Sequence, residues 1–153
     1  YHPVSENIQF KDSTGKGMDW VESVVKYERP DVVILDMGDK FADIRSERTD
    51  ITLKAAAIHA RNIAKQYECA VIWMSQLSAE AEGRADLNQA MMEGSKTGKA
   101  AEADLMILIG KTQQAEGEEE DPVRYLNIAK NKLNGYQGKI TCVLDGSRSV
   151  YSA

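Results

Sequence analysis

The stretch that decides the fold is Pro30–Phe41, PDVVILDMGDKF. Its apolar residues Val32–Leu35 run directly into Asp36. A short run rich in Val and Ile, with no helical period, is typical of a strand buried on both faces of a parallel sheet. In open α/β sheets ligands bind beyond the carboxyl ends of the strands, where Asp36 is expected to stand. A carboxylate there can hold Mg²⁺, or it can cap the loop that follows.

The composition favours one domain over residues 1–153. The chain has 153 residues, 42% of them hydrophobic, which is ordinary for a soluble domain with a core of its own. No signal peptide or run long enough to cross a bilayer is visible, so we expect a cytoplasmic protein without a membrane partner. Cys69 and Cys142 lie in apolar runs and are expected to be buried thiols, and two distant histidines give no zinc site. Because the first residue is Tyr1 rather than Met, we expect a piece of a longer protein.

The net charge of −5 argues only weakly against a nucleic-acid partner. Much of it comes from one acidic segment, and the rest of the chain is neutral, with 19 basic and 19 acidic residues. The acidic segment contains Glu116, Glu118, Glu119, Glu120 and Asp121. Local patches of charge, rather than the net charge, must therefore decide whether the chain binds a nucleic acid.

A strand–helix–strand unit is expected around Asp36. Thr52–Tyr67 has the alanines and apolar spacing of a helix, and the apolar spacing of Met18–Tyr27 predicts an earlier one. Cys69–Met74, CAVIWM, predicts a second buried strand. Such a βαβ unit is expected to be parallel, so Gln76 and Asp36 should emerge at the same edge of the sheet. There the amide of Gln76 can bond a phosphate or a water, or it can satisfy loop backbone.

A glycine- and lysine-bearing segment, GSKTGKA at residues 94–100, follows a short helix expected around Leu87–Met92. It is not a P-loop, which needs four residues between its glycines and then Lys-Ser/Thr. Here three residues separate the glycines and alanine follows the last lysine, and the earlier STGKG also fails. Such a loop can still contact a nucleic-acid backbone, although a solvated loop is the alternative. The residues that would make the contact are Ser95, Lys96, Thr97 and Lys99.

The last part of the chain predicts strands. Asp104–Ile109, DLMILI, indicates a third buried strand. Arg124–Ala129 and Lys139–Leu144 indicate two more, joined by NKLNGYQG, whose Asn-Gly pair is a strong hairpin signal. Near the turn, Lys130 and Lys132 point to the same side of the strand, either as functional groups or as a basic tip that discourages edge aggregation. Asn7–Phe10 is a further possible strand.

Taken in order, these motifs resemble the ATPase domain of DnaB-like, ring-shaped replicative DNA helicases, especially the phage and Twinkle-like branch. The resemblance runs from about Ile8 to Ala153 and rests on PDVVILD, VIWMSQ, EGSKTGKAAEADLMI and IAKNKLNGYQGKI. It implies an α/β fold: the C-terminal portion of a RecA-like P-loop NTPase core, with a mostly parallel sheet and a C-terminal β-hairpin. The family's P-loop and catalytic glutamate would lie upstream of Tyr1, so the chain matches the C-terminal half of that domain.

The resemblance also implies roles for single residues. Asp36 matches the aspartate that holds the Mg²⁺ of Mg-ATP, and Gln76 matches the polar sensor of the γ-phosphate. Lys130 and Lys132 match the basic pair that reaches the ATP of the neighbouring subunit. The family usually has arginine where this chain has Lys132, and lysine lacks the planar fork, so Lys130 is expected to carry more of that role. The implied DNA-binding loop contains Ser95, Lys96, Thr97 and Lys99.

The implied function is ATP-dependent DNA unwinding by a hexameric ring that moves along single-stranded DNA, in the cytoplasm of a cell or of a phage host. Without the phosphate cradle, this chain alone is expected to bind ATP poorly and to be inactive. Two alternatives stay open. Another RecA-type ATPase, a recombinase or a clock-type ATPase, shares the core. PDVVILD also resembles the phosphoacceptor strand of response-regulator receivers, although Met37 is not followed by the expected proline and the chain ends in a hairpin.

Overall fold

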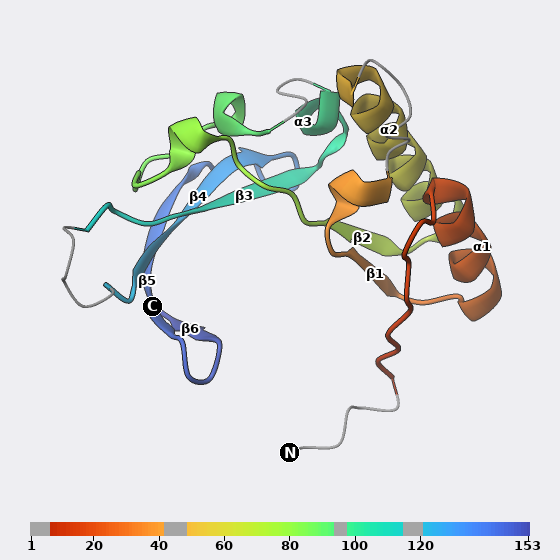
Figure 1. The fold of residues 1–153 in the computed structure, drawn as a ribbon, viewed down its shortest axis with the longest axis horizontal. Helices are drawn as coiled ribbons and strands as arrows, with labels where there is room; N and C mark the ends of the chain where they lie inside the picture. Colours follow the sequence, from red (N-terminus) through yellow and green to blue (C-terminus); the bar gives the residue numbers. More distant parts are fainter. Residues whose placement is uncertain (1–6, 42–48, 94–97, 115–120) are drawn as a thin grey trace.

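The structure is a computed structural model that describes residues 7–41, 49–93, 98–114 and 121–153. The described chain forms two lobes joined in an arch (Figure 1). The first lobe contains α1 (Met18–Glu28), β1 (Val32–Leu35), the 3-10 helix η1 (Gly38–Phe41), α2 (Thr49–Tyr67) and β2 (Ala70–Trp73). The second contains the 3-10 helices η2 (Ala79–Ala81) and η3 (Gln89–Met91), α3 (Gly98–Glu102), β3 (Leu105–Gly110), β4 (Val123–Asn131), β5 (Gly138–Asp145) and β6 (Val150–Ser152).

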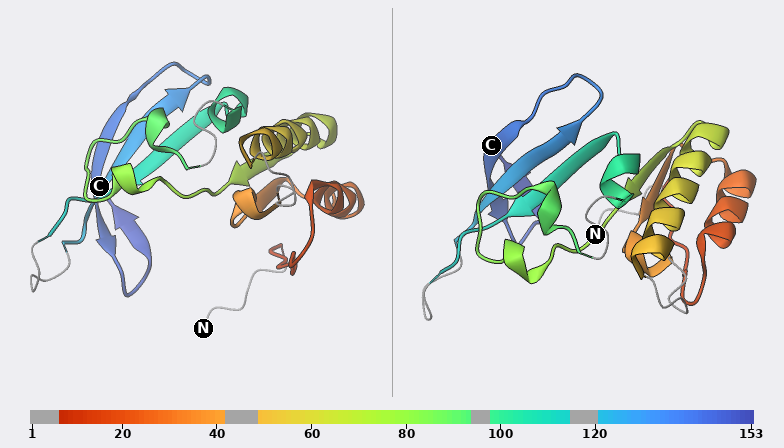
Figure 2. Two further views of the ribbon diagram at one scale, coloured as in Figure 1. Left: turned by 45° about the horizontal axis from the view of Figure 1, so that its top comes forward. Right: turned by 90° about the horizontal axis from the view of Figure 1, so that it is seen from above.

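The first lobe is the predicted strand–helix–strand unit. β1 and β2 pair in parallel, from Val32 opposite Ala70 to Leu35 opposite Trp73. Helices α1 and α2 lie on one side of this pair (Figure 2). Their apolar stripes meet the strands in a core that includes Val21, Val25, Leu35, Leu53 and Ile63. The prediction of a parallel pair with a covering helix is therefore confirmed.

The second lobe corrects the prediction of a mostly parallel sheet. Its four strands are antiparallel, in the order β3-β4-β5-β6, so β1–β2 is the parallel pair among the described strands. The run DLMILI does form a strand, but its burial alternates: Met106 and Leu108 face the core, whereas Ile107 and Ile109 are exposed. A run that is apolar at every position hides this alternation, which is why it indicated a strand buried on both faces.

The predicted hairpin is present between β4 and β5. Gly135 has φ +78°, a conformation that glycine adopts without strain, and the side-chain oxygen of Asn131 accepts the backbone N–H of Leu133 at 3.0 Å. Both strands extend beyond their predicted bounds, and β6 adds a strand that the sequence did not indicate. Asn7–Phe10 is not a strand, and the helix expected around residues 87–92 is the short η3.

The second lobe has its own small core, which includes Leu87, Met91, Met92, Ala100, Met106 and Leu108. A buried asparagine, Asn127 on β4, holds the segment between η2 and η3 in place, because its side-chain amide donates to the Ala85 carbonyl at 2.9 Å. Cys69 and Cys142 are buried free thiols, as expected. Within the described ranges, no helix is long and apolar enough to cross a membrane.

Candidate functional site

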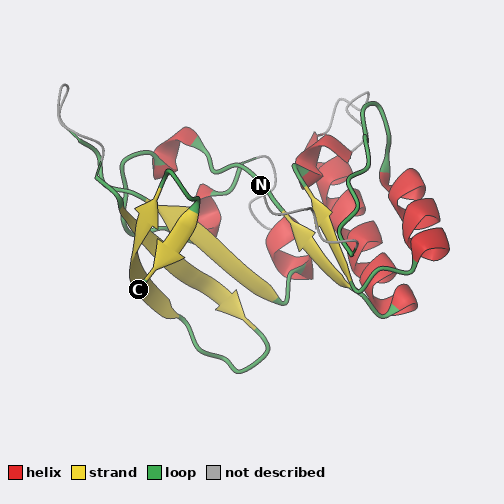
Figure 3. Ribbon diagram, turned by 90° about the horizontal axis from the view of Figure 1, so that it is seen from below, coloured by secondary structure: helices red, strands yellow, loops and turns green. Residues whose placement is uncertain are grey.

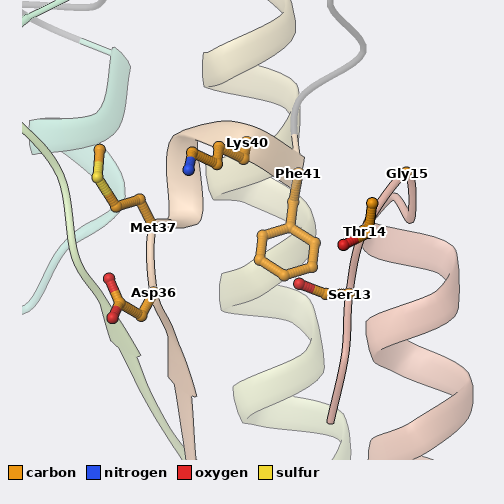
Figure 4. A pocket seen from close by; sticks show the side chains of 7 residues that line it. All are labelled: Ser13, Thr14, Gly15, Asp36, Met37, Lys40 and Phe41. Atoms are coloured by element: carbon orange, nitrogen blue, oxygen red, sulfur yellow. The ribbon is translucent and has the colours of Figure 1, made fainter.

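Asp36 lies where the sequence placed it, directly after the last residue of β1. It lines a pocket of about 400 Å³ between the start of η1 and the turn at residues 12–15 (Figure 4). Asp12 fixes that turn, because one of its carboxylate oxygens accepts the N–H of Thr14 at 3.0 Å and its hydroxyl at 2.7 Å. These hydrogen bonds lower the pKa of Asp12 below its ordinary value. The pocket is lined by Ser13, Thr14, Gly15, Asp36, Met37, Lys40 and Phe41.

The Asp36 carboxylate suits a magnesium ion that shares its other ligands with water and substrate. It is exposed and points toward the side of β2, away from Ser13 and Thr14 (Figure 4). Among the described residues, no three His, Cys, Asp or Glu side chains come together to hold a metal. Mg²⁺ in nucleotide sites usually takes one or two carboxylates and completes its shell with waters and phosphates, so one carboxylate fits such an ion.

The segments that carry Asp36 and Gln76 lie side by side beyond the strand ends. The backbone N–H of Met74 donates to the Leu35 carbonyl at 3.1 Å, and the N–H of Gly38 donates to the Met74 carbonyl at 2.8 Å. The two segments thus stay hydrogen-bonded just past the strands, to Gly38 after β1 and to Met74 after β2. Gln76 is exposed just beyond this point, and its carbonyl accepts the N–H of Glu93 at 3.3 Å.

Lys99, expected to face DNA, is instead buried. Its side chain is 4% exposed, and its ammonium lies 2.9 and 3.0 Å from the two carboxylate oxygens of Asp39. The ammonium also donates to the Ser75 hydroxyl at 2.7 Å. To reach a phosphate, this ammonium would have to break its contacts with Asp39 and Ser75, so Lys99 does not suit the DNA role. The other residues predicted for DNA contact, Ser95, Lys96 and Thr97, lie outside the described residues.

Sequence reasoning missed Asp39 and Ser75, which complete this buried cluster. The indole N–H of Trp73 donates to Asp39 at 3.0 Å, and the Ser75 hydroxyl donates to the other Asp39 oxygen at 2.6 Å. The one visible signal was position: Asp39 and Ser75 closely follow the ends of the two predicted strands. Nothing in the sequence joined either to Lys99, which is 60 residues beyond Asp39.

Lys130 lies on β4 and Lys132 directly follows the end of that strand, and the ammonium groups of both reach the C-terminal end of α3. The Lys130 ammonium donates to the carbonyls of Ala100 and Ala101, the latter at 3.2 Å. Burial, with the nearby charge of Lys132, lowers the pKa of Lys130. The Lys132 ammonium is more exposed and lies 3.4 Å from both the Ala101 carbonyl and a carboxylate oxygen of Asp104.

Arg61 on α2 joins the first lobe to the same end of α3. Its guanidinium donates to the Glu102 carbonyl at 2.5 Å and lies 3.4 Å from the carboxylate of Asp104. Asp104 is therefore shared between Arg61 and Lys132. As a result α3, which lies on the side of the second lobe nearest the first (Figure 3), is held by charged side chains at both ends.

Solved structures share this fold, among them two helicase structures. One is a DnaB-like replicative helicase, described with its interactions with primase, with a TM-score of 0.79 and 18% identity over 95% of this chain and 37% of that chain. The other is a helicase ATPase domain with a TM-score of 0.75 and 16% identity over 89% of this chain and 51% of that chain. The chain therefore has the fold of DnaB-like helicase ATPase domains, which confirms the resemblance seen in the sequence, and it spans about half of one relative and less of the other. No protein-family model and no curated protein matches the sequence.

Proposed function

We propose that this chain is the C-terminal half of the ATPase domain of a DnaB-like replicative DNA helicase. The observation that carries the proposal is the adjacent ends of β1 and β2, with Asp36 beyond one and Gln76 beyond the other, in a fold shared with helicase ATPase domains. This is the edge of an α/β sheet at which nucleotides bind. The complete protein would form a ring, hydrolyse ATP between subunits and move along single-stranded DNA.

The uncovered apolar surface supports the idea of a half-domain. On the face of β1 and β2 away from the helices, Val32, Ile34 and Ile72 are 48 to 61% exposed. On β3, Leu105, Ile107 and Ile109 are 43 to 51% exposed. Rows of large apolar residues on two sheets are uncommon on a free surface and usually mark contacts with other protein. In this proposal, the half of the domain that carries the P-loop covers them.

The described residues suggest a division of labour in the complete site. Asp36 would bind Mg²⁺ of Mg-ATP, partly through water, and Gln76 would hydrogen-bond the γ-phosphate. Phosphoryl transfer depends on positioning and on neutralising charge. Lys132, as the more exposed lysine, would approach the ATP of the neighbouring subunit, whereas Lys130 is already bonded to α3 of its own chain. The expectation that Lys130 carries more of that role is therefore reversed in this proposal.

For DNA, the proposal keeps Ser95, Lys96 and Thr97 and leaves out the buried Lys99. Contact would be with the sugar-phosphate backbone, so binding should depend weakly on sequence and strongly on salt. DNA dependence also separates the helicase from recombinase-like or clock-type ATPases, which share the core.

The test is ATP hydrolysis by the longer protein that contains this chain, with and without single-stranded DNA. We expect stimulation by DNA in the wild type and loss of activity on Asp36→Ala. The matched control is Asp19→Ala, because the Asp19 carboxylate on α1 is fully exposed and does not line the pocket of Asp36. Retained activity in Asp36→Ala would overturn the assignment of this site, and activity that ignores DNA would favour the other RecA-type ATPases. The isolated chain should hydrolyse no ATP.

A further inference from the structure

The buried cluster around Lys99 connects parts of the proposed site that are distant in sequence. Lys99 lies on α3, Asp39 lies on η1, and Ser75 comes shortly after the end of β2. Asp39 is three residues after Asp36, and Ser75 directly precedes Gln76. One ammonium therefore holds together the two segments that carry the candidate magnesium and phosphate ligands.

The cluster is built for fixed geometry. The Asp39 carboxylate accepts from three donors, the Lys99 ammonium, the Trp73 indole and the Ser75 hydroxyl, at distances of 2.6 to 3.0 Å. Lys99 as a whole residue, backbone included, is 5% exposed. Hydrogen bonds to charged groups in a buried setting are strong and directional, and the Lys99 ammonium cannot turn to water as a surface lysine can.

The opposite end of α3 contacts the other candidate catalytic groups. The carbonyls of Ala100 and Ala101 accept from Lys130, and that of Ala101 lies 3.4 Å from the Lys132 ammonium. Because α3 spans only Gly98–Glu102, a change in the position of Lys99 shifts these carbonyls as well. The same short helix thus touches the groups proposed for the chain's own ATP and those proposed for its neighbour's.

We propose that Lys99 is a positioning residue for ATP hydrolysis, because its buried ammonium fixes Asp39 and Ser75, and with them the segments of Asp36 and Gln76, relative to Lys130 and Lys132. This inference rests on the proposed function. Lys99 touches none of the reacting groups itself. Its loss should slow turnover, since small displacements of catalytic groups reduce rate strongly, while ATP affinity depends mainly on the phosphate cradle outside this chain.

The experiment replaces Lys99 in the longer protein and separates kcat from KM. In Lys99→Met we expect kcat for ATP to fall by about tenfold to 100-fold with KM changed less than about threefold. Lys99→Arg keeps the charge and should recover part of kcat. The control is Lys139→Met, which breaks an exposed ion pair with Asp86, 2.6 Å long, and should leave kcat unchanged.

A spectroscopic readout follows the cluster without relying on activity. Trp73 donates to Asp39, so its fluorescence should change in Lys99→Met once Trp20, the other tryptophan of this chain, and every tryptophan outside this chain are replaced by Phe. If Lys99→Met does not fold, Ser75→Ala removes one hydroxyl from the same cluster and should lower kcat with the same split. Unchanged kcat in the folded Lys99 or Ser75 variants, beside an active wild type, would overturn the positioning role alone. A wild type without ATPase would instead overturn the proposed function.

Discussion

Lys99 belongs to the start of the short helix α3, whereas Lys132 approaches the C-terminal end of that helix, and the environments of the two lysines differ sharply. The Lys99 side chain is 4% exposed and pairs with Asp39 at 2.9 Å. The Lys132 side chain is 43% exposed, and its nearest carboxylate oxygen, on Asp104, is 3.4 Å away. A buried ion pair fixes structure because neither charge can be left alone there, whereas an exposed lysine is free to change partners. Of these two lysines, the buried one is fixed within the fold, whereas the exposed one is free to change partners.

Breaking the buried pair should have the largest effect on stability. Asp39→Ala leaves the Lys99 ammonium buried, with the Ser75 hydroxyl as its remaining partner in the cluster. We expect the free energy of unfolding to fall by about 3–5 kcal/mol, the usual result of removing one partner from a buried pair. Denaturant titration measures it.

The matched control is Asp86→Ala, which removes the carboxylate from the exposed pair with Lys139. Its cost should be no more than about 1 kcal/mol. Equal losses in the two variants would mean that the Lys99 pair is no more important to the fold than a surface pair.

The close packing of Gly38 against Trp73, next to the same cluster, should give a second and smaller effect on stability. A Cβ placed on Gly38 would lie 2.4 Å from the ring carbons of Trp73, whose indole donates to Asp39. Gly38→Ala should therefore push Trp73 aside and lower the free energy of unfolding by about 1–3 kcal/mol, as overpacking usually does.

Gly146→Ala is the control for this substitution, because a Cβ there meets nothing within 4 Å. Thermal unfolding of the two variants side by side tests the difference. A Tm for Gly38→Ala equal to that of the control would show that Trp73 can move without cost.

The exposed lysine should behave in the opposite way to the buried cluster. Lys132→Ala is expected to change the free energy of unfolding by less than about 1 kcal/mol, because its contacts are long and solvated. In the longer protein, however, it should reduce ATP turnover by about 100-fold or more if it acts on the neighbour's nucleotide. A second test mixes Lys132→Ala subunits with Asp36→Ala subunits. If Lys132 acts on the neighbour's ATP, some interfaces of the mixed rings contain both an intact Asp36 and an intact Lys132, and ATP turnover should partly recover. A stable Lys132→Ala protein with normal turnover would remove this lysine from the site.

The first lobe could be predicted well from sequence because its signals are local. PDVVILD and CAVIWM are short apolar runs on either side of an alanine-rich helix, and the carboxyl ends of parallel strands meet at one edge. The positions of Asp36 and Gln76 followed from that rule alone.

What failed depended on contacts between distant residues. DLMILI is apolar at every position after its aspartate, so its sequence could not show that one face stays exposed or that its partner is β4. Lys99 sits in a glycine-rich run that favours a solvated loop, and its burial follows from an aspartate 60 residues earlier in the chain. Pairings of this kind carry no period or motif, because the fold alone brings the two residues together.

The smallest expected effect concerns a partly buried polar cluster on the outer helices, intermediate between the two lysine environments. A carboxylate oxygen of Glu22 on α1 lies 2.7 Å from the ring nitrogen Nε2 of His59 on α2, and the other accepts the Tyr67 hydroxyl at 3.1 Å. The hydrogen bonds from His59 and Tyr67 lower the pKa of Glu22 in the folded protein. A lowered native pKa means that the unfolded chain binds the proton more readily, so this stabilisation is present above the ordinary glutamate pKa of about 4.3 and is lost as pH falls through the native value.

Replacing Glu22 with glutamine tests this contribution, because the amide keeps the shape of the side chain but does not titrate. Glu22→Gln should reduce the fall in Tm as the pH drops below the ordinary glutamate pKa of about 4.3, because the native pKa of Glu22 is lower than that. Because the cluster is half-exposed, the difference should be small beside the effect of Asp39→Ala. Thermal unfolding of wild type and variant across this range measures it, and identical acid profiles would show that the α1–α2 contact does not depend on the Glu22 charge.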